Sequence, residues 1–123
     1  TIKGRENKFT GNPKNFYPSI NQVEETIKSF SVSGNYLPKL IKGDVMKTLL
    51  EEKNLPKSIS FLRLDTDLYK TTKMQLEILY PRLSTGGVLH IDDYGYCPGV
   101  KKATDEFFVN KKVWLQNRHF HAP

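Results

Sequence analysis

Apolar side chains along the chain follow two patterns. In some segments they recur every three or four positions, which is typical of helices with one buried face, and in others they form short apolar runs typical of buried strands. The first pattern predicts helices near residues 19–31, 44–54, 71–81 and 100–108. The second predicts strands near residues 36–42, 59–64, 88–91 and 113–115. Residues 1–18, rich in Gly, Pro, Asn and Lys, are predicted to form a polar loop.

After the first helix, the predicted strands and helices alternate. This order is typical of the α/β class, with a mostly parallel sheet of about four strands and flanking helices. With 123 residues the chain is long enough for one small core, so we expect residues 1–123 to form a single domain. Ser19 is expected to cap the first helix and Thr71 or Thr72 the third, while residues 84–87 are expected to form a turn.

Two pairs of aspartates follow two successive predicted strands. Asp65 and Asp67 come after residues 59–64, and Asp92 and Asp93 come after residues 88–91. Because the carboxyl ends of neighbouring parallel strands meet at one edge of a sheet, we expect the four side chains to share a crevice. Carboxylates this close repel one another unless they share protons or a cation, and an all-oxygen set suits Mg²⁺, Mn²⁺ or Ca²⁺. The alternative is that these aspartates only form turns and cap helices.

Composition narrows the class of protein. The chain carries 19 Lys+Arg against 13 Asp+Glu, a net charge of +6, which attracts anionic ligands. The lysines are scattered, so solubility explains them as well, and nucleic acid is not the expected partner. No stretch approaches the roughly 20 apolar residues of a membrane span, and the lone cysteine, Cys97, cannot form an internal disulfide. We therefore expect a cytoplasmic protein without a membrane partner.

Three chemistries use aspartates placed after strands. A haloacid-dehalogenase-type phosphatase needs Ser/Thr and Lys motifs between its acids, and the interval from Asp67 to Asp92 is too short for them. A glycosyltransferase with an Asp-x-Asp metal site needs a nucleotide-binding region upstream of these residues. The third chemistry is methyl transfer.

Four linked motifs surround these aspartates. They are Leu62–Tyr69 (LRLDTDLY), Leu79–Gly87 (LYPRLSTGG), Ile91–Gly95 (IDDYG) and Pro98–Phe107 (PGVKKATDEF). In type and spacing they resemble the macrocin O-methyltransferase family, strongly over residues 59–108 and more weakly at Thr1–Gly4 and Gly43–Asp44. The resemblance implies a partial Rossmann-like fold of the class I methyltransferases. It also implies S-adenosylmethionine as methyl donor, Mg²⁺ as cofactor, and a sugar hydroxyl of a small-molecule natural product or glycan as acceptor.

Carried onto this chain, the resemblance assigns site residues. It implies metal ligands at Asp65, Asp92 and Asp93 and a general base at Asp67. It also implies that Gly43 and Asp44 lie near the adenine of the methyl donor, although Asp44 fits an ordinary helix N-cap equally well. In such a site Mg²⁺ lowers the pKa of the acceptor hydroxyl, and a carboxylate removes the proton before methyl transfer.

The family's Gly-rich cofactor loop and ribose-binding acid have no counterpart here. We therefore expect a truncated form that corresponds to the C-terminal portion of the fold. Whether this form is active without the rest of the fold is left open. The alternative is a non-catalytic binding module whose basic surface takes an anionic ligand or nucleic acid. An incomplete sheet would also leave an edge that favours a homo-oligomer.

Three histidines and the cysteine are expected to have structural roles. His90 is predicted to be a packed or hydrogen-bonded strand residue, and Cys97 a small buried thiol rather than a nucleophile. His119 and His121 share one side of a possible terminal strand, where a frayed segment is the expected structure.

Overall fold

The computed structural model of the chain describes residues 18–30 and 38–113. The chain divides into two compact units, Thr1–Lys42 and Gly43–Pro123. Of the predicted polar loop only Pro18 is among the described residues, and His119 and His121 lie outside them. Within the described part, no helix combines the length and the apolar character required for a membrane crossing.

The first unit contains helix α1, Ile20–Phe30, where the sequence predicts a helix. Ser19 and Gln22 form a reciprocal cap: Ser19 Oγ accepts from the Gln22 N–H at 3.3 Å, and Gln22 Oε1 accepts from the Ser19 N–H at 2.7 Å. The predicted cap at Ser19 is thus confirmed. The strand predicted at residues 36–42 is wrong in its described part, because residues 38–42 have no strand structure. Pro38 lacks the N–H that a ladder requires.

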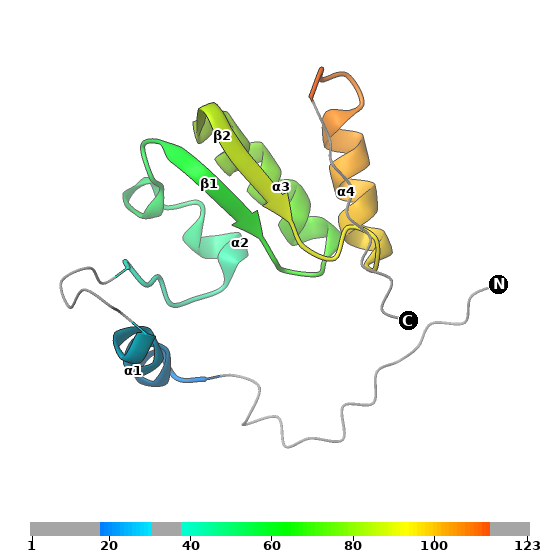
Figure 1. The fold of residues 1–123 in the computed structure, drawn as a ribbon. Coiled ribbons are helices and arrows are strands. Elements are labelled where there is room, and N and C mark those ends of the chain that lie inside the picture. Colours follow the sequence, from blue (N-terminus) through cyan, green and yellow to red (C-terminus); the bar gives the residue numbers. More distant parts are fainter. Residues whose placement is uncertain (1–17, 31–37, 114–123) are drawn as a thin grey trace, which may run out of the picture. The chain divides into compact units, whose positions relative to one another are not determined.

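The second unit supplies the sheet and its covering helices (Figure 1). Its α-helices are α2, Val45–Thr48, α3, Tyr69–Leu79, and α4, Pro98–Phe108. Two short 3₁₀ helices, η2, Glu52–Asn54, and η3, Tyr80–Arg82, follow α2 and α3. The strands are β1, Ile59–Leu64, and β2, Leu83–Ile91, which pair in parallel. The α/β class and the parallel sheet are confirmed, and the described residues contain two strands of the four predicted.

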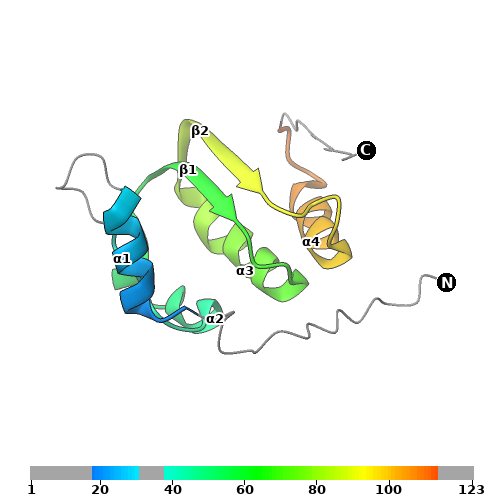
Figure 2. The same cartoon turned by 60° about the horizontal axis from the view of Figure 1, so that its bottom comes forward.

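Helices α3 and α4 lie side by side on one face of the strand pair, as Figures 1 and 2 show. Between them and the strands lies a core of Leu62, Leu64, Leu76 and Phe108. The rings of Tyr80, Phe107 and Phe108 meet edge to face, with centroids 4.9–5.3 Å apart. The α3–α4 layer therefore fixes the orientation of the strands and of the loops at their carboxyl ends.

Several boundaries differ from the sequence-based predictions. The helix predicted over 44–54 is two separate turns, α2 and η2. Helix α3 begins at Tyr69 rather than at Thr71 or Thr72, and its N-cap, Leu68, offers no side-chain acceptor. The segment 84–87 is not a plain turn: it lies within β2, where the register shifts between Ile59 and Phe61, and Gly86 has φ 79°. Val113, in the predicted last strand, has no strand structure.

Candidate functional site

The register of the sheet brings the two aspartate pairs together. Leu64 of β1 pairs with Ile91 of β2, and the Asp92 N–H donates to the Leu64 carbonyl at 2.9 Å. Asp65 and Asp92 are therefore the next residues after a matched pair, and both leave the same edge of the sheet. The structure confirms that the carboxyl ends of β1 and β2 deliver these acids to one place.

Three of these carboxylates can share a cation. Asp65, Asp92 and Asp93 offer ligand atoms that all lie within 4.8 Å of one another. Octahedral oxygen ligands about 2.1 Å from Mg²⁺ lie about 3 to 4.2 Å apart, so small rotations of half-exposed side chains reach that spacing. Hard, anionic oxygens are also the donors that Mg²⁺ prefers. The donor set therefore fits Mg²⁺ in chemistry and in spacing.

Arg63 contacts two of the three acids. Its Nη2 atom lies 2.8 Å from Oδ2 of Asp65 and also donates to Oδ2 of Asp92. The hydrogen bond from Arg63 holds the pKa of Asp92 below its usual value. The guanidinium thus balances part of the negative charge of the crevice.

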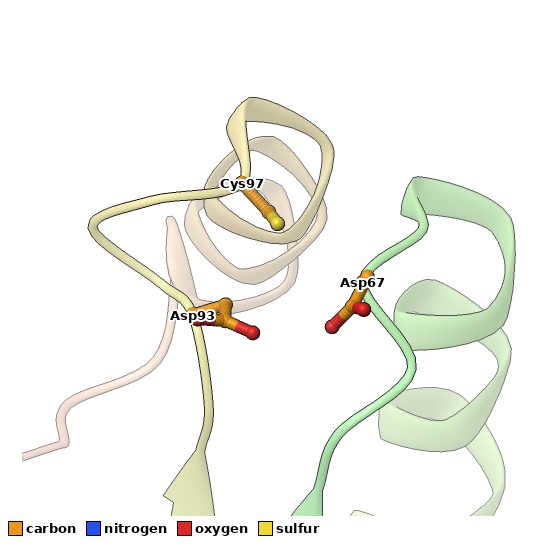
Figure 3. A group of neighbouring side chains, drawn as sticks. All are labelled: Asp67, Asp93 and Cys97. Carbon is orange, nitrogen blue, oxygen red and sulfur yellow. The ribbon is translucent and has the colours of Figure 1, made fainter. Parts of the chain in front are cut away.

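A second group of side chains adjoins the first and shares Asp93 with it. The ligand atoms of Asp67, Asp93 and Cys97 lie within 4.8 Å of one another. Figure 3 shows the Asp67 and Asp93 carboxylates pointing toward each other, with Cys97 at the start of α4 directed toward the same gap. Partial burial, followed by the charge of Asp92 and a hydrogen bond with Asp67, raises the pKa of Asp93. Burial and the charges of Asp93 and Asp67 raise the pKa of the Cys97 thiol, which therefore favours the neutral form.

The backbone of the two facing acids is unusual. Asp67 and Asp93 have φ of 56° and 53°, in the left-handed region that few residues other than glycine occupy. Aspartate tolerates this region better than most residues, because its short polar side chain can bond locally. Each of these turns sends a carboxylate toward the other instead of continuing the direction of its strand.

The loop after β1 is held against α3 by a network of polar side chains that was not predicted from the sequence. Thr66 Oγ1 donates to Oε1 of the buried Gln75 at 3.2 Å, and Thr71 Oγ1 donates to Thr66 Oγ1 at 2.8 Å. Thr66 lies between Asp65 and Asp67, so this network fixes both. A signal was available: Thr72 and Gln75 are polar residues on the same helical face as Leu76 and become buried with it.

The loop after β2 is held by its own contacts to α4. The Asp93 carbonyl accepts from the N–H groups of Tyr96 and Cys97 at 3.0 and 2.8 Å. The hydroxyl of Tyr94 donates to Oδ1 of Asp105, which also pairs with Lys101. The first two bonds close the turn before α4, and the third ties the segment that carries Asp93 to Asp105 in the second half of α4.

The remaining predicted residues lie elsewhere in the second unit. Asp44 caps α2, its Oδ1 accepting from the Met46 N–H at 2.9 Å, and Gly43 precedes it with φ 148°. Neither residue belongs to the two groups of potential ligands. His90 lies in β2, as predicted, but it is exposed and faces away from α3 and α4, so of its two predicted roles the packed one is wrong. Cys97 is half-buried, close to the prediction of a small buried thiol.

Comparisons with known proteins agree on one class of enzyme, the O-methyltransferases. The sequence model of the macrocin-O-methyltransferase (TylF) family matches residues 6–117. The chain is 46% identical over 50 residues to demethyldecarbamoylnovobiocin O-methyltransferase of Streptomyces niveus, covering 41% of this chain and 19% of that protein. It is 56% identical over 36 residues to 8-demethyl-8-(2,3-dimethoxy-alpha-L-rhamnosyl)-tetracenomycin-C 4'-O-methyltransferase of Streptomyces olivaceus, covering 29% of this chain and 14% of that protein. The chain thus matches less than a fifth of either relative's length, and no solved structure matches it.

Proposed function

The chain belongs to the macrocin-O-methyltransferase family, and from this premise we propose that it serves Mg²⁺-dependent methylation of a sugar hydroxyl on a small molecule. The observation that carries the proposal is the meeting of Asp65, Asp92 and Asp93 at one edge of the sheet, with ligand atoms within 4.8 Å. The name of one relative specifies a rhamnosyl group, which supports a sugar-bearing acceptor. Because the family consists of O-methyltransferases, we propose S-adenosylmethionine as the methyl donor.

The four aspartates divide between two proposed roles, metal binding and proton transfer. Asp65, Asp92 and Asp93 would hold Mg²⁺, which in such a site lowers the pKa of an acceptor hydroxyl. Asp67 would accept the hydroxyl proton, because its carboxylate faces the metal-site residue Asp93 across a short gap (Figure 3). S-adenosylmethionine would supply the methyl group from its sulfonium to the deprotonated acceptor oxygen and would leave as S-adenosylhomocysteine. Gly43 and Asp44, at the turn before α2, would lie on the adenine side of the donor.

Divalent-cation affinity tests the proposal most directly. Mg²⁺ and Mn²⁺ are titrated calorimetrically into the 123-residue chain and into Asp92→Asn and Glu77→Gln variants. We expect Asp92→Asn to weaken cation binding at least tenfold, because it replaces an anionic ligand by a neutral one. Glu77→Gln makes the same carboxylate-to-amide change at an exposed position of α3, outside both groups of potential ligands, and should leave the affinity unchanged.

The alternative, a non-catalytic module that uses its basic surface, predicts a different result. Such a module is not expected to bind the cations, and the substitution Asp92→Asn is then not expected to change its affinity for them. Absence of binding by the unmodified chain, or equal affinity in all three proteins, would count against the methyltransferase proposal. Binding that only Asp92→Asn disrupts would count against the module.

A further inference from the structure

We infer that Arg63 is a resident cation of the crevice: its side chain lies between Asp65 and Asp92 and must leave when a divalent cation binds. The inference rests on the proposed function, because it takes these aspartates to be the Mg²⁺ ligands. It adds a regulatory element to that site: Arg63 lowers the affinity for the cation and sets the concentration at which the site fills.

The strand geometry places Arg63 between the acids. Arg63 and Asp65 are two residues apart, and Arg63 pairs with His90, which is two residues before Asp92. Side chains two apart along a strand share one face. One guanidinium nitrogen, Nη2, therefore contacts an oxygen of Asp65 at 2.8 Å and an oxygen of Asp92, the residue that follows the neighbouring strand β2. A single positively charged atom bridges the ends of both strands.

The bridge can open without disturbing the core. Arg63 lies on the face of β1 opposite the buried Leu62 and Leu64, and its side chain is 51% exposed. The side chains of Asp65 and Asp92 are 44% and 35% exposed. Rotation of the Arg63 side chain into water therefore breaks two ion pairs but exposes no core residue.

Two effects of Arg63 oppose an entering cation, and both lower the affinity of the site for it. The cation must displace charge-assisted hydrogen bonds to two of its three ligands. The guanidinium also remains attached to β1 two residues from Asp65, where its positive charge repels the cation. Removing Arg63 should therefore tighten cation binding about fivefold to tenfold, since a neighbouring unit charge in a water-exposed site has an effect of this order.

A purely structural role for Arg63 predicts the opposite change. If the bridge served to hold Asp65 and Asp92 in position for the metal, its removal would let the carboxylates separate and would weaken binding. The direction of the change in affinity therefore distinguishes a competing cation from a positioning clamp.

The experiment compares four proteins by calorimetric titration of Mn²⁺ and Mg²⁺: the unmodified chain, Arg63→Gln, Arg63→Lys and Arg82→Gln. Arg82 is the matched control, because it also makes an arginine–carboxylate bridge, to Glu52, but stands at the opposite end of β2. Its replacement removes the same charge from the molecule. We expect Arg63→Gln to bind about fivefold to tenfold more tightly, Arg63→Lys to lie between it and the unmodified chain, and Arg82→Gln to be unchanged.

Each outcome bears on one statement. Unchanged or weaker binding by Arg63→Gln, in a protein whose circular dichroism matches the unmodified chain, overturns the inference while leaving the proposed metal site intact. Equal tightening in Arg82→Gln also overturns it, because net charge would then be the cause. If none of the four proteins binds either cation, the proposed function fails, and the inference fails with it.

A second readout needs no variant. In the unmodified chain, the NMR signals of the Arg63 guanidinium should shift when Mg²⁺ is added to saturation, because the two ion pairs are lost. A signal that stays in place at saturating Mg²⁺ contradicts displacement.

Discussion

Asp92 and Asp93 are adjacent in the sequence but have opposite electrostatic neighbours. The hydrogen bond from Arg63 lowers the pKa of Asp92, while burial, Asp92 and Asp67 raise the pKa of Asp93. Adjacent carboxylates with pKa values that differ in this way lose their protons at different pH, Asp92 before Asp93 as the pH rises. The difference comes from the contacts of each side chain, since the residue types are identical.

At a distance from the crevice, Asp105 gives a test of electrostatics at a single residue. Hydrogen bonds from Lys101 and then Tyr94 lower the pKa of Asp105 in the folded chain. A lowered pKa stabilises the fold above the unfolded value of about 3.9, and the contribution is lost as the pH falls through the folded pKa. Asp105→Asn should therefore cost less than about 1 kcal/mol at neutral pH, because the side chain is about half exposed.

Urea unfolding of both proteins between pH 7 and pH 3 measures this effect. The difference in free energy of unfolding should stay constant down to about pH 4 and then shrink. A difference that grows as the solution becomes more acidic would contradict the assignment. Lys102→Gln, which removes a more distant i,i+4 partner of Glu106, at 3.9 Å, serves as control and should change stability less.

The sequence predicted the four aspartates but not the residues that hold them. Acids at strand ends are visible in a sequence, because a parallel sheet places those ends together. Arg63 and Thr66 lie beside these acids in the sequence, yet their roles depend on the register and on Gln75, which meets Thr66 only once α3 has packed. The contacts of Arg63 and Thr66 therefore depend on the tertiary structure and cannot be read from the neighbouring sequence.

At the scale of elements, α3 and α4 lie close together at their first turns, where Gly99 meets Tyr69. A Cβ atom on Gly99 would lie 3.0 Å from the Tyr69 backbone nitrogen and 3.3 Å from its Cβ. Backbone atoms cannot move aside as the end of a flexible side chain can. The absence of a side chain at Gly99 therefore allows α4 to begin directly against the start of α3.

Gly99→Ala should destabilise the fold by about 1 to 2 kcal/mol, although alanine is the better helix former. Thermal unfolding followed by circular dichroism measures the loss. Gly99→Val should cost more, because its branched side chain needs still more space. An alanine variant as stable as the unmodified chain would mean that the two helices can separate at no cost.

The helix boundaries show the same limit of sequence reasoning. Thr71 and Thr72 look like N-caps, but Thr71 bonds to Thr66 and the carbonyl of Leu68, and Thr72 is buried. The helix starts earlier, at Tyr69, where Gly99 packs. By contrast, the cap at Ser19 depends only on Gln22, three residues away, and was predictable from the local sequence. The start of α1 depends on a local cap and was predicted correctly, whereas the start of α3 depends on tertiary contacts and was not.

On the scale of the whole molecule, the second unit depends on a small core. Leu76 is fully buried and packs with Leu62, Leu64 and Phe108, the other members of the buried core cluster among the described residues. Leu76→Ala should lower the free energy of unfolding by about 2 to 5 kcal/mol, through lost burial and a cavity. Because a small domain has little stability in reserve, we expect a loss of cooperative unfolding at the upper end of that range.

Leu50→Ala is the matched control for this substitution. Leu50 is 72% exposed in the same unit, and its replacement should change stability by less than about 0.5 kcal/mol. Guanidinium titration of both variants gives the comparison. Equal effects of the two substitutions would mean that the α3–α4 layer does not carry the stability of the sheet.

The α/β class of the molecule was predictable because alternation of strands and helices follows from hydrophobic periodicity alone. The membership of individual segments in the sheet was not, as two described segments show. The apolar run at 36–42 contains Pro38, and its described part makes no ladder, while the segment at 84–87 joins β2 despite its two glycines. Membership in a sheet depends on a partner strand, which the sequence of the segment itself does not contain.

The left-handed backbone at Asp67 and Asp93 determines how these positions can be probed. Alanine at φ near 55° adds backbone strain to the loss of the carboxylate, so an alanine scan would report two effects as one. Asparagine accepts the same dihedral angles and nearly the same volume while removing only the charge. Glycine relieves the backbone and removes the side chain altogether. The pair Asn and Gly, compared at each position, separates the chemistry of the carboxylate from the shape of the turn that presents it.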